Sequence, residues 1–260
     1  DKMRVNMNKK LVIANWKMNL NMHESSLFLH KLSENIAVHR KMETILAPSM
    51  FTLQSLSLQI NHRQFKLAAQ NFYWRDSGPF TGEVAISQLR GIVQYALVGH
   101  SERRYVFGET DKDVRAKVAA ALRNNIRPIL CIGETSEERN FGETDLVIND
   151  QLLGGLANVS SEEIDKVVIA YEPVWAIGTG DHAMPEDVEK AVRTIRSQIK
   201  HLYGQKPSEN VQVIYGGSIQ PEFAADYLKL NGVDGLLVGG ASLSLEKFKQ
   251  ITEKVYETIK

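Results

Sequence analysis

A short apolar run followed by an amphipathic helical pattern recurs eight times along the 260-residue chain. Each run is only a few residues long and apolar nearly throughout, which is typical of parallel strands buried on both faces. The runs lie at residues 11–14, 44–47, 66–69, 96–98, 128–132, 167–171, 211–215 and 235–238. The clearest helical patterns lie at 24–37, 111–124, 185–202, 221–228 and 245–259. Asp111 is the expected N-cap of the second of these, and Pro185 and Pro221 are expected in first turns.

Eight such repeats match a closed (β/α)₈ barrel, an α/β fold that typically has about 250 residues. A doubly wound open sheet shares the alternation of strands and helices, but it usually carries a glycine-rich turn after its first strand. Here residues 15–19 follow the first run and contain no glycine. We therefore predict one barrel domain over residues 1–260, with residues 1–9 as a short N-terminal extension.

The charge and apolar content limit the partners that this chain can have. Its formal net charge is zero, so no global field favours nucleic acid or anionic lipid. No apolar stretch reaches the roughly 18 residues that a membrane span needs, and the first ten residues lack the apolar run of a signal peptide. The single cysteine, Cys131, permits no disulfide within the chain. We expect a cytoplasmic protein that acts on a small molecule, with no nucleic-acid or membrane partner.

Polar residues and glycines follow five of the eight apolar runs. Functional groups of a barrel gather at the C-terminal ends of its strands, so these residues should share one end of the molecule. They are Asn15 and Lys17 after the first run, His100, Ser101 and Glu102 after the fourth, Glu172 after the sixth, Gly216, Gly217 and Ser218 after the seventh, and Gly239 and Gly240 after the eighth.

The two glycine pairs indicate an anion site. Backbone N–H groups without neighbouring side chains can approach an anion closely, and barrel phosphate sites commonly follow strands seven and eight. Either pair alone is equally well explained as a tight turn between strand and helix. Lys17 is a candidate cation for the same anion, although a lone lysine is more often a solvated surface residue. His100 precedes a helical segment and could donate a hydrogen bond as a neutral imidazole, although a lone histidine is more often structural.

Glu172 ends an apolar run and directly precedes Pro173, which biases it toward extended backbone at the rim of the barrel. A carboxylate there is either part of an ion pair or a base. The loop that follows has an apolar tip at residues 175–177 and glycines at 178 and 180. A lid that closes over a ligand explains such a loop, and a plain buried connection is the alternative. A base, a hydrogen-bond donor, a cation and a phosphate cradle suffice for proton transfer beside a carbonyl, without cofactor or metal.

Five blocks resemble the signature blocks of the triosephosphate isomerase family, in that family's order and spacing. They are ANWKMN at 14–19, VGHSERR at 98–104, AYEPVWAIGTG at 170–180, YGGS at 215–218 and LVGGAS at 237–242. The resemblance implies a single (β/α)₈ TIM barrel that interconverts dihydroxyacetone phosphate and D-glyceraldehyde 3-phosphate through an enediolate. Another phosphate-binding barrel isomerase or lyase, or a non-catalytic binding barrel, is the alternative; a lyase of the aldolase type would need a Schiff-base lysine inside a strand.

The resemblance also implies a role for each site residue. Glu172 would be the base, with His100 as the donor to the enediolate oxygens and Lys17 and Asn15 as polarising groups. Ser101 and Glu102 would support these side chains. Ile177 and Leu237 would pack over Glu172 when the lid closes. The phosphate would be held by backbone N–H groups of Gly178, Ser218, Gly239 and Gly240.

The family is typically homodimeric, and residues 70–83 resemble its interface loop. Thr81 would brace Asn15 of the partner subunit, and Glu83 would pair with Arg103 of the partner subunit. The residues alone show only an aromatic-rich loop, which fits an interface anchor or a cluster within the chain equally well. The chain departs from the family pattern at residues 181–183, at Leu20 and at Phe223, and the sequence offers no account of Phe223.

Overall fold

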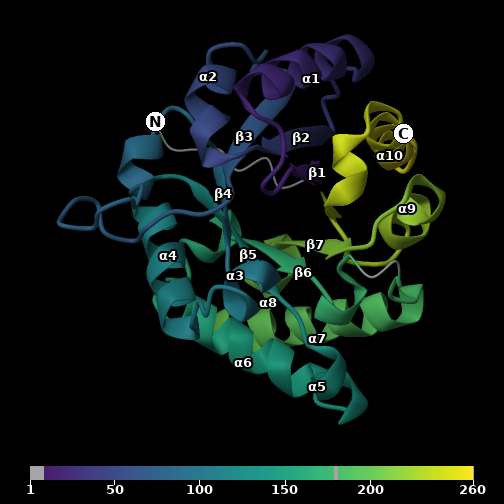
Figure 1. Cartoon of the computed structure of the whole chain (residues 1–260). Coiled ribbons are helices and arrows are strands. Elements are labelled where there is room, and N and C mark those ends of the chain that lie inside the picture. The colour runs from purple at the N-terminus through teal and green to yellow at the C-terminus, as the bar shows by residue number, and fades with distance from the viewer. Residues whose placement is uncertain (1–8, 179–180, 260) are drawn as a thin grey trace.

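Eight parallel strands close into a barrel in the computed structural model, which describes residues 9–178 and 181–259 (Figure 1). Each strand pairs with its neighbours in chain order, and the last pairs with the first. The strands are β1 Lys10–Asn15, β2 Met42–Ala47, β3 Phe65–Ala69, β4 Tyr95–Val98, β5 Arg127–Ile132, β6 Val168–Tyr171, β7 Gln212–Gly217 and β8 Gly235–Val238. The predicted (β/α)₈ barrel is confirmed. Of the predicted N-terminal extension, residues 1–8 lie outside the described residues.

Helices surround the barrel and connect successive strands (Figure 1). The α-helices are α1 Met22–Asn35, α2 Leu53–Ser57, α3 Ser101–Tyr105, α4 Asp111–Arg123, α5 Ser136–Asn140, α6 Thr144–Leu156, α7 Pro185–Tyr203, α8 Gln205–Asn210, α9 Pro221–Leu228 and α10 Leu245–Glu257. Short 3₁₀ turns lie at η1 Met50–Thr52, η2 Ile86–Leu89, η3 Ile164–Lys166, η4 Val174–Ala176 and η5 Gly240–Leu243.

The two expected first-turn prolines are confirmed, and the expected cap of α4 is not. Pro185 and Pro221 occupy the first turns of α7 and α9, where the missing N–H group of proline has no helical partner to lose. The prediction that Asp111 caps α4 is wrong by one residue. Thr110 is the cap, since its hydroxyl accepts from the Asp113 N–H at 3.3 Å while the Asp113 carboxylate accepts from the Thr110 N–H at 2.9 Å. This reciprocal pair satisfies two N–H groups that the first helical turn leaves open.

Strand β7 runs two residues further than the apolar pattern indicates. Gly216 and Gly217 pair with Leu237 and Val238 of β8, so the glycines lie in the ladder before the turn begins. The pattern of apolar residues cannot predict this extension of the strand, because a glycine has no side chain and is more typical of turns.

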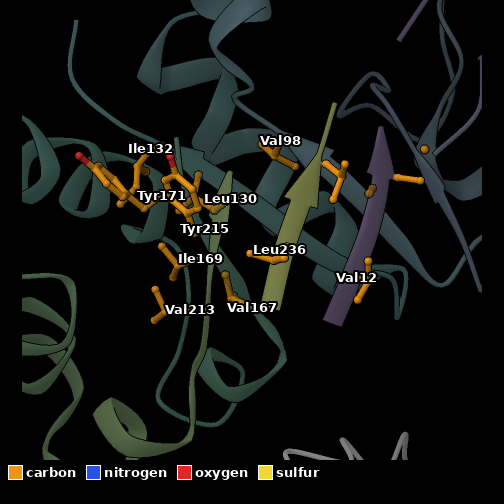
Figure 2. Packing of buried hydrophobic residues seen from close by; sticks show 14 of the residues in the cluster. Val12, Val98, Leu130, Ile132, Val167, Ile169, Tyr171, Val213, Tyr215 and Leu236 are labelled. Atoms are coloured by element: carbon orange, nitrogen blue, oxygen red, sulfur yellow. The ribbon is translucent and has the colours of Figure 1, made fainter. Parts of the chain in front are cut away.

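Alternate residues of each strand face opposite sides of the barrel wall, and they form two separate clusters. The inner cluster consists of Leu11, Ile13, Ile45, Ala47, Ala68, Tyr95, Leu97, Ile129, Cys131, Val168, Ala170, Ile214 and Leu237. The outer cluster fills the layer between strands and helices, and Figure 2 shows part of it, including Val12, Leu130, Ile169, Val213 and Leu236. Strands buried on both faces explain why the eight runs are apolar throughout.

Candidate active site

Two of the predicted site residues continue the inner face of their strands. Leu11 and Ile13 point into the barrel, so Asn15 at the end of β1 does so as well. By the same alternation Glu172 follows Val168 and Ala170 of β6. Both polar side chains therefore cap the apolar interior at one end of the barrel. Asn15 is 5% exposed and Glu172 is 4% exposed.

The Glu172 carboxylate faces the His100 imidazole across this end of the barrel. Oε1 of Glu172 lies 3.5 Å from Nε2 of His100, and both side chains are almost fully buried. The other carboxylate oxygen, Oε2, is buried without a hydrogen-bond partner among the described residues. A buried carboxylate oxygen that has no partner in the described part of the chain is poised to accept a proton or a hydrogen bond from a ligand.

Glycines make the space that the Glu172 side chain occupies. A Cβ atom at Gly216 would lie 2.8 Å from Cγ of Glu172 and 3.3 Å from Cβ of Leu237. At Gly133, which follows β5, a Cβ atom would lie 1.9 Å from the Glu172 carbonyl oxygen. Gly216 was singled out in the sequence as part of an anion site. The structure shows that it is required by the close packing of Glu172 and Leu237.

The backbone of α3 orients the His100 ring. His100 is the N-cap of α3, and its Nδ1 accepts the Glu102 N–H at 3.2 Å. An accepting Nδ1 has a lone pair, so in the neutral ring the proton is assigned to Nε2, which faces Glu172. The predicted role of His100 as a neutral donor is consistent with this tautomer. Ser101, the first residue of α3, is buried directly beside it.

Lys17 adopts a left-handed backbone conformation with φ of +53°, which is uncommon for a residue with a side chain. Two contacts hold it there. Oδ1 of Asn15 accepts the Lys17 N–H at 3.1 Å, and Nε2 of Gln70 donates to the Lys17 carbonyl oxygen at 2.9 Å. Its ammonium group is 2.5 Å from Oε1 of Glu102. A strained backbone that its surroundings maintain is a common property of functional sites.

Gln70 was predicted only as the first residue of the interface loop 70–83, and not as part of the active site, although it follows β3 directly. It also donates to the carbonyl oxygen of Ala47 at 2.8 Å, and so ties the ends of β1, β2 and β3 together. The available signal was its position, since it is a polar residue at the same end of the barrel as Asn15 and Lys17.

The predicted phosphate-binding residues lie on three neighbouring segments. An added Cβ atom at Gly239 would meet only Cε of Lys17, at 3.8 Å, and at Gly240 or Gly178 it would meet nothing within 4 Å. Packing therefore does not require these glycines, unlike Gly216. Ser218 reaches the loop after β6, because its hydroxyl donates to the Ala176 carbonyl oxygen at 2.6 Å. Thr179 and Gly180 of the predicted lid lie outside the described residues.

The leading part of that loop is attached to Glu134, which follows β5 and was not identified from the sequence. The Trp175 indole donates to Oε1 of Glu134 at 2.9 Å, and the Tyr171 hydroxyl donates to the same carboxylate. Burial raises the pKa of the Glu134 carboxyl group, while the hydrogen bond from Trp175 opposes that effect. The Arg139 guanidinium lies over the face of the Trp175 ring, 4.0 Å from the ring centroid.

A cavity of about 160 Å³ lies beside Asn15, Lys17 and His100. It is lined by Asn15, Lys17, Met18, Gln70, Asn71, Leu97, His100, Glu102, Arg103 and Phe107.

In residues 9–178 and 181–259, no group of three or more His, Cys, Asp and Glu side chains could hold a metal ion. Nor does the described part of the chain include a helix long and apolar enough to cross a membrane.

Cys131 lies in the inner cluster below Glu172, as a buried free thiol. Burial raises its pKa well above the ordinary value, and the neighbouring Glu172 charge acts in the same direction. The thiol therefore stays protonated and packs as a small apolar group.

Comparison with known proteins places the chain among isomerases. The model of the family described as triosephosphate isomerase matches residues 10–255. The triosephosphate isomerase of Treponema denticola is 42% identical over 246 residues, which cover 94% of this chain and 98% of the relative. That of Alkaliphilus oremlandii is 41% identical over 93% of this chain and 98% of the relative. That of Caldanaerobacter subterraneus subsp. tengcongensis is 40% identical over 94% of this chain and 99% of the relative.

These matches extend over nearly the whole chain and confirm the resemblance of the five sequence blocks. They also confirm the enzyme class that was expected. The chain belongs to the triosephosphate isomerase family.

Proposed function

We propose that this single-domain enzyme interconverts dihydroxyacetone phosphate and D-glyceraldehyde 3-phosphate, with Glu172 as the base. The observation that supports it most strongly is the opposition of Glu172 Oε1 and His100 Nε2 at 3.5 Å in a buried site. One small sugar can contact both groups, because their side-chain atoms lie only 3.5 Å apart.

The reaction moves one proton between adjacent carbons. Glu172 takes a proton from the carbon beside the carbonyl, which leaves an enediolate, and returns a proton to the neighbouring carbon. The hydroxyl proton moves between the two oxygens at the same time, so no atom is gained or lost. His100 donates through Nε2 to these oxygens and stabilises the charge that develops on them. Asn15 and Lys17 lie on the β1 side and polarise the same oxygens.

The phosphate group is held by backbone N–H groups of Gly178, Ser218, Gly239 and Gly240, with Lys17 as the nearby cation. The open space around Gly239 and Gly240 supports this assignment, since it leaves their backbone N–H groups accessible to an anion. Lys17 Cε lies close to Gly239, which brings the ammonium group toward the cradle. Closure of the loop after Glu172 brings Ile177 against the carboxylate beside Leu237 and excludes water from the intermediate.

The enzyme acts as a homodimer through residues 70–83. This segment projects from the barrel between β3 and η2 (Figure 1). Thr81 and Glu83 are exposed there. In the proposed dimer Thr81 contacts Asn15 of the partner subunit and Glu83 pairs with Arg103 of the partner subunit. Arg103 is still about one third exposed although it pairs with Glu109. The cytoplasm is the expected compartment, in keeping with a cysteine that is buried as a free thiol.

A coupled assay with glyceraldehyde 3-phosphate on the purified protein, with and without a chelator, tests the activity and its independence of metal. We expect turnover that the chelator leaves unchanged. Absence of turnover in both samples would reject the isomerase reaction, and loss of turnover only with chelator would reject metal-free proton transfer.

A further inference from the structure

Helix α9 contacts the far end of the loop that follows Glu172, at residues that no signature block includes. Phe223 and Tyr227 lie four positions apart in α9, so they share one face of the helix. Their partners in the loop are His182 and Ala183, which lie between Gly178 and the start of α7.

The Phe223 ring stacks on the His182 imidazole. The two ring centroids are 4.5 Å apart and the planes are inclined by 13°. Phe223 remains 39% exposed, so burial in the core does not account for a phenyl group at this position. Stacked aromatic pairs contribute stabilisation beyond that of the area they bury, so the contact with His182 accounts for the phenyl group.

The Tyr227 hydroxyl holds the next residue. It donates to the carbonyl oxygen of Ala183 at 2.8 Å, and both residues are almost fully buried. Burial raises the pKa of the Tyr227 phenol, so the hydroxyl stays protonated and donates at neutral pH. The Tyr227 ring in turn packs on Tyr215 of β7, with centroids 4.2 Å apart. The contact is therefore anchored in the barrel wall.

The same region of the chain contacts the loop a third time. Ser218 lies three residues before the first residue of α9 and donates to Ala176, as described above. The opposite, leading part of the loop is attached to a different element through Trp175 and Glu134. The loop is thus attached to the segment after β5 on one side and to α9 on the other.

We propose that Phe223 and Tyr227 are positioning residues that hold the trailing end of the active-site lid through His182 and Ala183. This inference rests on the proposed function, because the loop is a lid only if the site binds a triose phosphate. Neither residue touches the reacting atoms. By holding residues 182 and 183 they fix where Gly178 lies when phosphate binds, so they affect substrate binding more than the proton transfer.

Phe223→Ala removes the stack and Tyr227→Phe removes only the hydroxyl. Each variant should raise the KM for glyceraldehyde 3-phosphate about fivefold, as expected for one lost contact, with a much smaller change in kcat. In the free protein, hydrogen exchange of the amides of residues 181–184 should become faster by a similar factor. Phe223→Trp should restore both values, because it restores an aromatic face.

Two matched controls separate this effect from general loss of packing. Tyr203→Phe also removes a hydroxyl that donates to backbone carbonyl oxygens, those of Leu156 and Val159, far from the loop. Phe141→Ala removes a phenyl group that is 72% exposed. Both should leave the KM and the exchange of residues 181–184 unchanged. His182→Ala should have no further effect once Phe223 is alanine, since the two changes remove one contact.

Unchanged KM and unchanged exchange in folded Phe223→Ala and Tyr227→Phe proteins would overturn the proposal. Equal changes in the controls would overturn it as well, because they would show a general effect on stability. If the unmodified protein does not isomerise triose phosphates, the proposed function fails instead. The hydrogen-exchange measurement still decides then whether α9 holds residues 181–184.

Discussion

Nε2 of His100 and Oε1 of Glu172 lie 3.5 Å apart, although 72 positions separate the two residues along the chain. The barrel creates this proximity by bringing the ends of β4 and β6 to one rim. The α3 backbone sets the imidazole orientation and Gly216 leaves room for the carboxylate. The proposed chemistry depends on this pair.

Shortening the base should separate it from the substrate without unfolding the protein. In Glu172→Asp the carboxylate retreats by one methylene group, and a displacement of about 1 Å can lower a rate about 100-fold. We expect kcat to fall by about 100-fold or more, with the thermal unfolding midpoint nearly unchanged. Steady-state kinetics and a circular dichroism melt measure the two quantities. An unaltered turnover number would reject Glu172 as the base.

A methyl group at Gly216 should disturb the same carboxylate from the neighbouring strand β7. The added Cβ of Gly216→Ala would lie 2.8 Å from Cγ of Glu172, so the side chain must move. We expect a fall in kcat of about 100-fold and a loss of about 1–3 kcal/mol in the free energy of unfolding.

Gly154→Ala on α6 is the matched control, because the nearest atoms to its Cβ would belong to Asp111, at 3.2 Å, and not to a site residue. Full activity in Gly216→Ala would show that Glu172 does not need the position seen in this structure.

Removing the Lys17 charge should weaken the interaction with anionic substrate at every stage of the reaction. Hydrogen bonds to charged groups contribute about 1.5–3 kcal/mol, so Lys17→Met should lower kcat/KM by about 10- to 100-fold. Glu102 is left without this partner but is nearly half exposed, so water can solvate it and the fold should persist. Lys112→Met, on the exposed start of α4, should leave kcat/KM unchanged. Equal values for both variants would contradict the assigned role of Lys17.

Charge reversal at Glu83 should separate the proposed dimer. In Glu83→Arg the new cation faces Arg103 of the partner subunit, and like charges at an interface repel. Sedimentation equilibrium should show a lower average mass than for the unmodified protein at the same concentration. Glu253→Arg, on the exposed face of α10, is the control. If the Glu83→Arg protein has the same dimer content as the control, the interface lies elsewhere.

The barrel could be predicted from the sequence because strands buried on both faces leave an unbroken apolar signal. Asn15, His100 and Glu172 were identifiable as polar residues that end such strands. The role of Gly216 was not, since a glycine that makes room for a neighbour looks the same as a turn glycine. Glu134 and the stack of Phe223 on His182 depend on contacts between segments distant in the chain, which no local pattern encodes.

The most direct test is to follow the reaction in D₂O by proton NMR with the unmodified protein and with Glu172→Gln. The substitution keeps the shape of the side chain but removes the base. Transfer of a proton through a carboxylate predicts that the unmodified protein incorporates deuterium at the carbon that receives the proton in the product. It also predicts that Glu172→Gln shows neither isomerisation nor deuterium incorporation. Deuterium incorporation at the rate of the unmodified protein in Glu172→Gln would contradict the account.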